Sequence, residues 1–245
     1  MTELPNADQL FAVMDATWPP RATTPCGPFV LRDGAGGGKR VSAATCAAGQ
    51  ASRDEVAAAS DAMRQRGESP LFGLRGDQHA FDQTLTDMGF SVIDPVVIYA
   101  NSAAALAALT PEGMPAIYTE SPLNIQAEIW AAGGIGPARL AVMARAKSPK
   151  THILARYNDR PAGVAFVAIH GDIAMLHALE VKEEFRRCGI GASTTACAAK
   201  WAVEQGARVL ALATTVENIG SNALYARMGM AVCARYHYRI LKEPS

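Results

Sequence analysis

Two arginines, Arg186 and Arg187, stand directly before a turn that carries glycines at positions 189 and 191. Glycine has no Cβ, so such a turn exposes backbone N–H groups to a ligand that approaches closely. The helical pattern that follows, over residues 190–205, would point its unpaired N–H groups and its partial positive charge at the same place. Guanidinium groups bind phosphate oxygens well, so this segment predicts an anion site suited to a diphosphate.

A second glycine cluster, Gly34–Gly38, offers an alternative phosphate site because Lys39 follows it. Its spacing is one residue short of the P-loop pattern, and Arg40 stands where Ser or Thr would hold magnesium. Short extended runs flank the cluster on both sides, at Phe29–Leu31 and Lys39–Val41. We therefore predict a β-hairpin that turns at the glycines rather than a phosphate loop.

The elements that position the arginine–glycine turn follow from hydrophobic periodicity and from helix caps. We expect a strand over 173–181 before the turn, and a buried strand over 209–215 after its helix. The fold class predicted from this order is mixed α/β. The other expected elements are helices at 4–17, 52–66 (with Ser52 as N-cap), 77–88, 124–131, a further one ending near 146, and 221–228, and strands at 71–74, 92–99, 152–157, 162–170 and 231–241.

The composition restricts the possible functions. Hydrophobic residues make up 49% and charged residues 19% of the 245 residues, which predicts a packed globular core. Lys plus Arg is 23 and Asp plus Glu is 23, so we expect neither a nucleic-acid partner nor an anionic membrane surface. The five cysteines form no CxxC pair, which favours a reducing compartment without a disulfide scaffold or a metal site. Without a signal-peptide pattern or a bilayer-length apolar run, the protein is expected to be soluble and cytoplasmic.

Two motifs resemble the signatures of the GNAT superfamily of acyl-CoA-dependent N-acyltransferases. The first signature is Q/R-x-x-G-x-G/A at the start of a helix, and residues 186–191 read Arg-Arg-Cys-Gly-Ile-Gly. The second is an Asn, then Leu-Tyr, then Gly-Phe; Asn218, Leu224 with Tyr225, and Gly229 match it, with Met in place of Phe. The signatures occur in the family's order, with a helix and a strand between them, and the resemblance covers residues 124–241.

The resemblance implies a GNAT-like central mixed sheet flanked by helices. The first half is similar to the degenerate N-terminal half of tandem GNAT proteins, and its Gly89 and Phe90 match the family's Gly-Phe after a helix. Because this half lacks R-x-x-G-x-G, we expect it not to bind CoA. The expected division is a degenerate half at 1–105, a linker at 106–123 and an acyl-CoA-binding catalytic domain at 124–245.

Acetyl-CoA is the co-substrate that the resemblance implies. Main-chain groups of 179–181 would pair with the pantetheine amides, while the glycine turn and both arginines would bind the pyrophosphate. Asn218 matches a family asparagine that contacts the cofactor, and an N-cap is its alternative role. The implied cofactor-binding residues are Leu179, Glu180, Val181, Arg186, Arg187, Cys188, Gly189, Ile190, Gly191, Ala192, Asn218 and Tyr225.

The resemblance also assigns catalytic roles. Tyr225 matches the family tyrosine that protonates the departing CoA thiolate, although a buried helix tyrosine can also be a core residue. Many relatives carry a base early on the central strand, where this chain has Ala, Met and Leu at 174–176. His177 and Glu180 remain as candidate bases, directly or through water, and a lone strand histidine is commonly a core residue. Cys188 is disfavoured as a nucleophile, because direct transfer from a thioester requires none.

The leading functional prediction is transfer of an acetyl group from acetyl-CoA to a primary amine by direct attack. Deprotonating a lysine-type amine of pKa ~10.4 near neutrality costs about 4 kcal/mol, whereas an α-amine of pKa ~8 costs under about 1 kcal/mol. The missing strand carboxylate therefore favours a small amine or an α-amino group, such as a peptide N-terminus. The alternatives are a non-catalytic acyl-CoA-binding regulatory module and a partner-binding α/β domain without CoA. Trp130 and Met143 belong either to the acceptor wall or to the core.

Overall fold

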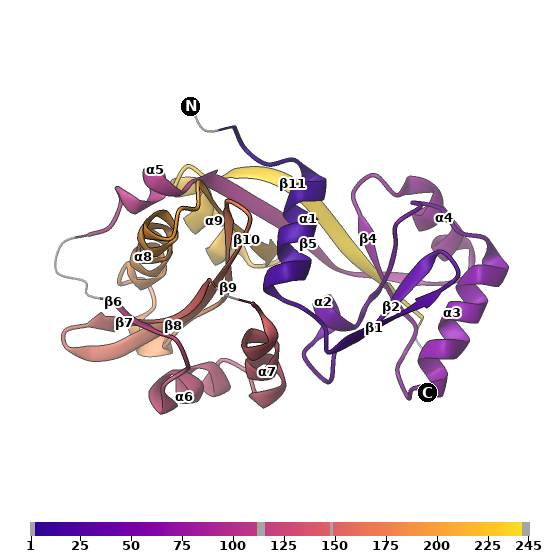
Figure 1. Cartoon of the computed structure of the whole chain (residues 1–245), viewed down its shortest axis with the longest axis horizontal. Helices are drawn as coiled ribbons and strands as arrows, with labels where there is room; N and C mark the ends of the chain where they lie inside the picture. Colours follow the sequence, from indigo (N-terminus) through magenta and orange to yellow (C-terminus); the bar gives the residue numbers. More distant parts are fainter. Residues whose placement is uncertain (1–2, 112–115, 148, 242–245) are drawn as a thin grey trace. The chain divides into compact units, whose positions relative to one another are not determined.

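A computed structural model describes residues 3–111, 116–147 and 149–241 (Figure 1). Helices and strands alternate along the chain, so the predicted mixed α/β class is confirmed. The elements are α1 (Ala7–Thr17), β1 (Ala22–Cys26), β2 (Phe29–Asp33), α2 (Lys39–Ser42), β3 (Ala44–Cys46), α3 (Arg53–Gln65), β4 (Leu71–Arg75), α4 (His79–Asp87), β5 (Ser91–Ser102), α5 (Ala103–Ala107), β6 (Ala116–Thr119), α6 (Asn124–Ala132), α7 (Pro137–Arg145), β7 (Lys150–Tyr157), β8 (Arg160–His170), β9 (Ile173–Val181), the short 3₁₀ turn η1 (Glu183–Phe185), α8 (Ile190–Glu204), β10 (Val209–Thr215), α9 (Ile219–Arg227) and β11 (Ala231–Ile240).

The chain forms two compact units, and each is built from several separate segments. Strands β5 and β11 each begin in one unit and end in the other, and α1 belongs with the second half of the chain. The sequence predicts two related halves, 1–105 and 124–245, joined by a linker at 106–123. This division stays a prediction, because the compact units have other boundaries. Unit 1 contains the residues up to Pro19, Ile98–Thr214 and Asn218–Ala234, and unit 2 contains Pro20–Val97, Thr215–Glu217 and the residues from Arg235.

The sheet of unit 1 has the strand order β11-β5-β10-β9-β8-β7-β6. Adjacent strands from β6 to β9 are antiparallel to one another, whereas β10 runs parallel to β9. Alternate residues of β8 face opposite sides of this sheet. Phe166 packs on Trp18, which follows α1, whereas Gly163 faces Ile190 of α8. Figure 1 shows the same layers, with α8 on one side of β7–β9 and with α6 and α7 on the other.

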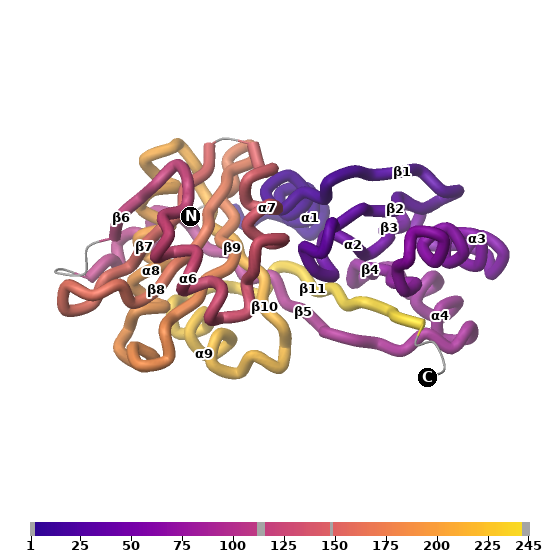
Figure 2. Tube along the Cα trace, turned by 90° about the horizontal axis from the view of Figure 1, so that it is seen from below, coloured from indigo at the N-terminus to yellow at the C-terminus, as the bar shows by residue number. Residues whose placement is uncertain are grey.

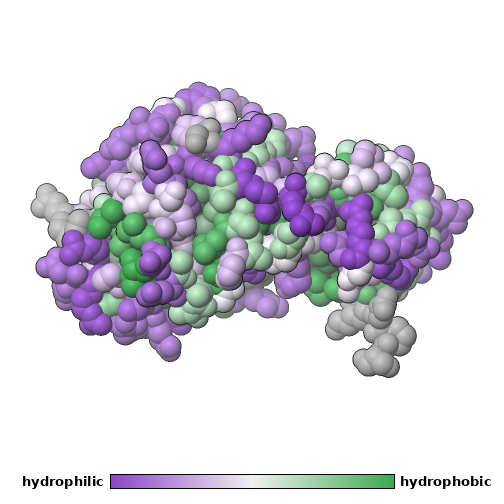
Figure 3. Space-filling model, turned by 60° about the horizontal axis from the view of Figure 1, so that its bottom comes forward, coloured by the Kyte–Doolittle hydropathy of each residue, from purple (hydrophilic) through white to green (hydrophobic). Residues whose placement is uncertain are grey.

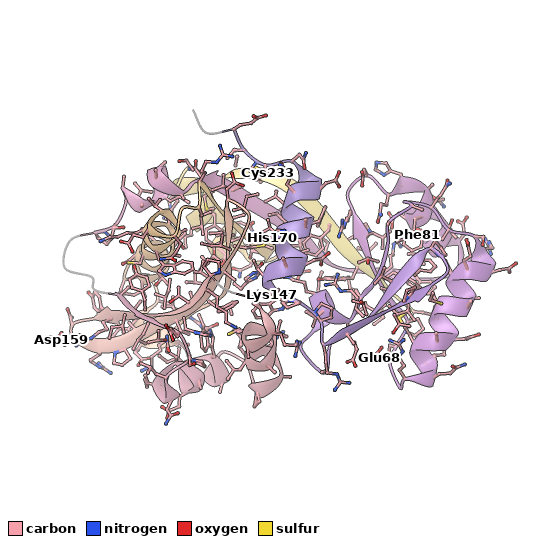
Figure 4. The ribbon with its side chains drawn as sticks, in the orientation of Figure 1. Glu68, Phe81, Lys147, Asp159, His170 and Cys233 are labelled. Atoms are coloured by element: carbon pink, nitrogen blue, oxygen red, sulfur yellow. The ribbon has the colours of Figure 1, made fainter. Side chains whose placement is uncertain are left out.

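The sheet of unit 2 has the order β1-β2-β3-β4-β11, with β5 next to β11. Helices α3 and α4 lie beside one another (Figure 2) and contribute to one apolar core with β2 and β4. Phe81 of α4, labelled in Figure 4, has its ring centroid 5.5 Å from that of Phe29 and 5.8 Å from that of Phe72. Helix α3 begins at the predicted cap, because Ser52 and Glu55 form a capping box there.

The hairpin predicted at the glycine cluster is wrong. Phe29–Leu31 lies in β2 as expected, but β2 pairs with β1 and β3, and Lys39–Val41 lies in the short helix α2. The carboxylate of Asp33 accepts a hydrogen bond from the N–H of Ala35, so the chain turns at once after β2. Strand β1 was not predicted because it contains a proline, which is rare in strands. An edge strand such as β1 can accommodate it.

Part of the expected linker is also regular structure. Residues 116–119 form β6, an edge strand that pairs with β7, and residues 103–107 form α5. Residues 112–115 of the expected linker lie outside the described residues. The strands predicted at 152–157 and 162–170 are confirmed as β7 and β8, which form a hairpin with Asp159 at its tip (Figure 4). A four-residue edge strand has too few side chains to show period-two alternation clearly, which explains why β6 was missed.

Candidate functional site

Strand β9 carries a β-bulge just before the arginine–glycine turn. Two of its residues, Ala178 and Leu179, stand opposite one residue of β8, and Ala178 adopts a positive φ of 49°. On either side of the bulge, His177 and Glu180 pair with β8 residues that are two positions apart. Residues two apart on a strand share a face of the sheet. The bulge therefore places the two candidate bases, three apart in sequence, on the same face.

Strands β9 and β10 separate where this bulge begins. Their parallel pairing ends at Leu176 and Leu212, although both strands continue. Beyond Leu176, the edge of β9 on this side consequently has backbone groups without a ladder partner in β10. An extended ligand with amide groups can pair with such an edge as an added strand would. The predicted main-chain positions 179–181 lie on this stretch.

The predicted anion site lies at the N-terminus of α8. Arg187 and Gly189 both have positive φ, at 65° and 80°, and Gly189 is the N-cap residue without a side-chain cap. The first N–H groups of α8 therefore point out of a helix of 15 residues. A Cβ at Gly191 would lie 3.0 Å from Cδ2 of Leu224, so the helices of the two sequence signatures meet at this glycine.

Arg186 bridges the glycine turn and the end of β9. Its Nη2 lies 3.5 Å from Oε1 of Glu180, and its Nε donates a hydrogen bond of 3.4 Å to the carbonyl of Val181. Arg186 and Arg187 are both exposed. The thiol of Cys188 is directed at the carbonyl of Arg186, 3.6 Å away. Two cationic side chains thus stand beside free helix N–H groups, which fits the chemistry of a diphosphate.

His177 is buried, with 3% of its surface exposed. Its Nε2 lies 2.8 Å from the hydroxyl of Thr17, and that hydroxyl donates its proton to the carbonyl of Val13. The imidazole is therefore tied to the last turn of α1. The ring stacks on Trp18 at 4.9 Å and on Phe166 at 6.1 Å between centroids. These contacts match the structural alternative for His177 more closely than the role of a base.

Glu180 is the more accessible of the two candidate bases. Its side chain is 22% exposed, and its carboxylate has the Arg186 guanidinium nearby. A Cβ placed on Gly133, after α6, would fall within 2.6 Å of the Glu180 side chain. The carboxylate therefore lies against the α6–α7 turn, on the sheet face that it shares with His177.

Tyr225 lies on α9 with 4% of its surface exposed. Burial raises the pKa of its phenol to about 12, and a hydrogen bond with Ser221 opposes this shift. Its ring lies 5.7 Å from the ring of Tyr99 on β5. The phenol thus remains protonated at all ordinary pH values, as a proton donor requires.

Asn218 is the N-cap of α9. Its side chain accepts from the N–H of Ser221 at 3.0 Å, and its carbonyl accepts from the side chain of Asn222 at 2.8 Å. The capping role is therefore confirmed, while cofactor contact by Asn218 stays a prediction. The next residue, Ile219, has an apolar side chain that is 74% exposed.

Figure 3 shows one largely hydrophilic face of the molecule, which apolar patches interrupt.

Trp130 and Met143 belong to the core, with exposures of 0% and 1%. The indole Nε1 of Trp130 donates a 2.8 Å hydrogen bond to the carbonyl of Ala178. Trp130 consequently holds the bulge of β9 from α6. The sequence carried no signal for this bond, because the two residues are 48 positions apart.

Three further residues around the site have partners that the sequence does not indicate. Thr17 hydrogen-bonds to His177, Tyr99 packs on Tyr225, and Gly133 leaves space for Glu180. Each acts on a partner at least 47 residues away in the chain, as the numbering shows. Only the glycine had a local signal, namely its position at the end of a predicted helix.

Comparison with protein families assigns the second half of the chain. Residues 115–230 match the family model described as the acetyltransferase (GNAT) family. The match includes β6, and it contains both sequence signatures. No curated protein matches the chain.

Several solved structures share the fold over nearly the whole chain. A GCN5-related N-acetyltransferase from Kribbella flavida has a TM-score of 0.71 at 20% identity, covering 99% of this chain and 98% of that one. A functionally unknown conserved protein from Staphylococcus epidermidis ATCC 12228 has a TM-score of 0.72 at 13% identity, covering 94% and 97%. A tandem GNAT protein from the clavulanic acid biosynthesis pathway has a TM-score of 0.60 at 15% identity, covering 95% and 87%. At such identities these likenesses show the fold alone.

Two features are absent from the described residues. No helix among them is long and apolar enough to cross a membrane. No group of three or more His, Cys, Asp or Glu side chains in the same part of the chain could hold a metal ion.

Proposed function

Residues 115–230 form a domain of the acetyltransferase (GNAT) family, and from this membership we propose that the protein transfers the acetyl group of acetyl-CoA to a primary amine. A small amine or an α-amino group, such as a peptide N-terminus, is the favoured acceptor. The observation that carries the proposal is the separation of β9 from β10 next to the N-terminus of α8. A strand edge and a helix terminus there offer binding groups of the two kinds that a pantetheine–diphosphate chain needs.

The cofactor would be held mainly by backbone groups. The free edge of β9 at 179–181 would pair with the pantetheine amides, and the N–H groups of residues 188–192 would bind the pyrophosphate. Arg186 and Arg187 would add charge-assisted hydrogen bonds to the phosphates. When bound, acetyl-CoA supplies the thioester-activated acetyl group. Because the backbone supplies most of these contacts, few side chains are needed for recognition.

Glu180 is the base in this proposal. It shares the sheet face of His177 but is accessible, whereas the His177 ring is buried and packs against Trp18 and Phe166. Its carboxylate would accept the proton of the attacking amine, directly or through one water molecule. A carboxylate is a weak base, so the chemistry favours an amine of low pKa over a lysine side chain.

Tyr225 is the proton donor in this proposal. Its buried phenol would hydrogen-bond to the sulfur as negative charge develops there, and would then protonate the leaving thiolate. The raised pKa of Tyr225 makes it a weaker acid, but burial disfavours a thiolate in the same way. The pKa values of the Tyr225 phenol and of the CoA thiol therefore shift in the same direction.

An acceptor screen tests the function directly. The protein is incubated with acetyl-CoA and a panel of small amines, amino acids, peptide N-termini and lysine side chains, and the release of free thiol is followed. We expect turnover with at least one acceptor of low pKa and slower turnover with lysine side chains. Binding of acetyl-CoA without transfer to any acceptor would instead favour the non-catalytic acyl-CoA-binding module, for which the apolar run at 174–176 argues.

Substitution of each candidate base then identifies the group that titrates. Glu180→Gln should lower kcat/KM for the amine by about 100-fold and remove the acidic limb of the pH–rate profile. His177→Ala should mainly reduce thermal stability, because the buried ring packs against two aromatic side chains. The reverse pattern would transfer the role of base from Glu180 to His177.

A further inference from the structure

Gly133 is the C-cap residue of α6, at the start of the turn that leads to α7. Its backbone has φ −85° and ψ 9°, a conformation that any residue adopts. The glycine is therefore not required by the backbone, in contrast to Gly134, whose φ is +77°. Another reason must account for the absence of a side chain at this position.

That reason is the space occupied by Glu180. A Cβ on residue 133 would lie 2.5 Å from Cδ and 2.6 Å from Cγ and Oε2 of the Glu180 side chain. Carbon atoms pack at about 3.5 to 4.0 Å, so one methyl group would displace the carboxylate by about 1 Å. Gly136, in the same turn, has no atom within 4 Å of such a Cβ. Among the glycines of this turn, only Gly133 has the tight contact.

The contacts around Glu180 determine where its carboxylate can go. Gly133 lies on one side of it, and the guanidinium of Arg186 lies 3.5 Å away. The bulge in β9 directs the side chain to the same sheet face as His177. Resting on the proposed function, we infer that Gly133 is a positioning residue, whose missing side chain lets the Glu180 carboxylate occupy the place where it accepts a proton from the acceptor amine.

Gly133→Ala tests this inference without disturbing the fold. Alanine suits the backbone at this position, and the group that must move is the end of a flexible side chain. A displacement of about 1 Å costs on the order of 100-fold in a well-aligned reaction, so kcat/KM for the amine should fall by about 10- to 100-fold. The KM for acetyl-CoA should change by less than about twofold, because the substitution removes no group that would bind the cofactor.

Gly136→Ala is the matched control, because it adds the same methyl group to the same turn in open space at φ −86°. Its kcat/KM should stay within about twofold of the wild-type value. Two further measurements separate positioning from a general loss of structure. The midpoint of thermal unfolding of Gly133→Ala should not fall below that of the wild type, and its crystal structure should show the Glu180 carboxylate displaced from Arg186.

Wild-type kinetics in Gly133→Ala, or an undisplaced carboxylate, would overturn the inference while leaving the proposed function intact. An equal loss of activity in Gly136→Ala would also overturn it, because the effect would then belong to the turn as a whole. If the wild-type protein acetylates no amine in the screen, the proposed function fails, and the inference fails with it. The two failures are distinguished by the activity of the wild-type protein.

Discussion

At the scale of single residues, the environment of Tyr225 defines what its phenol can do. The side chain is almost fully buried, and Tyr99 packs against its ring. Burial raises the pKa of Tyr225 to about 12, against the ordinary value of 10.0. The proton is therefore retained until a stronger base, such as a desolvated thiolate, forms beside it.

Tyr225→Phe should reduce kcat by about 100-fold with little change in the affinity for acetyl-CoA, because the ring remains and only the proton donor is lost. Single-turnover kinetics and calorimetry would measure the two quantities separately.

The same variant should also change how folding stability depends on pH. The folded-state pKa of Tyr225 is raised. The contribution of its protonated phenol to folding stability is therefore complete below pH 10 and is lost as pH rises towards 12.

Between these pH values, Tyr225→Phe should therefore lose less stability than the wild-type protein. Unfolding midpoints recorded at pH 9 and at the alkaline end of this window would show the difference. An unchanged kcat in Tyr225→Phe across the pH range would remove Tyr225 from the mechanism.

At the scale of elements, one side-chain bond holds the irregular part of β9. The bulge leaves Ala178 with a positive φ, and the indole of Trp130 on α6 satisfies the Ala178 carbonyl. A bulge of this kind interrupts pairing and redirects the strand. Here it brings His177 and Glu180 onto one face.

Trp130→Phe should destabilise the protein by on the order of 2 kcal/mol, because it leaves a partly buried carbonyl without its donor. It should also weaken acetyl-CoA binding, since the loosened bulge is part of the strand edge proposed to hold the cofactor. Trp201→Phe, at a buried tryptophan on α8, is the control for the loss of ring volume. Equal effects on acetyl-CoA affinity in the two variants, measured by calorimetry, would argue against a special role for the bond to Ala178.

At the scale of the whole molecule, the end of the last strand is attached to α4 in unit 2 by hydrogen bonds to a partly buried carboxylate. Asp82 on α4 accepts hydrogen bonds from Nε of Arg239 at 2.7 Å and from Nε2 of His237 at 2.9 Å. Arg239 also donates to the carbonyl of Phe90 at 2.9 Å, and its side chain is 10% exposed. Burial alone would raise the pKa of Asp82, but the hydrogen bonds from Arg239 and His237 outweigh it and hold the pKa below its ordinary value.

Asp82→Asn should cost on the order of 3 kcal/mol of stability, because it leaves the buried Arg239 without its counter-charge. The folded-state pKa of Asp82 is depressed, so its contribution is present above pH 3.8 and is lost as pH falls below that value. Urea unfolding at pH 7 and at a series of pH values below 3.8 would show the loss and its decrease in acid.

Asp87, on the same helix, provides the control. Its Oδ2 lies 4.0 Å from Nη2 of Arg53, and both side chains are exposed. Asp87→Asn should change stability by less than about 1 kcal/mol. All residues of the proposed cofactor site lie in unit 1, so neither substitution should change acetyl-CoA affinity under conditions where the protein is folded. A specific loss of affinity in Asp82→Asn would show that unit 2 contributes to the site.

Much of the fold was predictable because its signals are local. The capping box at Ser52, the glycine stop of α4, and the short apolar runs of β7 and β8 each act within a few positions of the chain. The same holds for the glycine turn and for α8, which formed where they were expected. The glycine cluster at 34–38 was misread because a turn after a strand leads equally well into a helix or a second strand.

By itself, the sequence determined most of the element types, the family signatures and the residues of the arginine–glycine turn. Tertiary structure alone decided that His177 is packed away beneath Trp18, that Trp130 holds the bulge, and that Gly133 leaves room for Glu180. The physical reason is that these contacts join residues far apart in the chain. Which side chains meet across a sheet depends on strand register, and one extra residue in β9 changes which of them share a face.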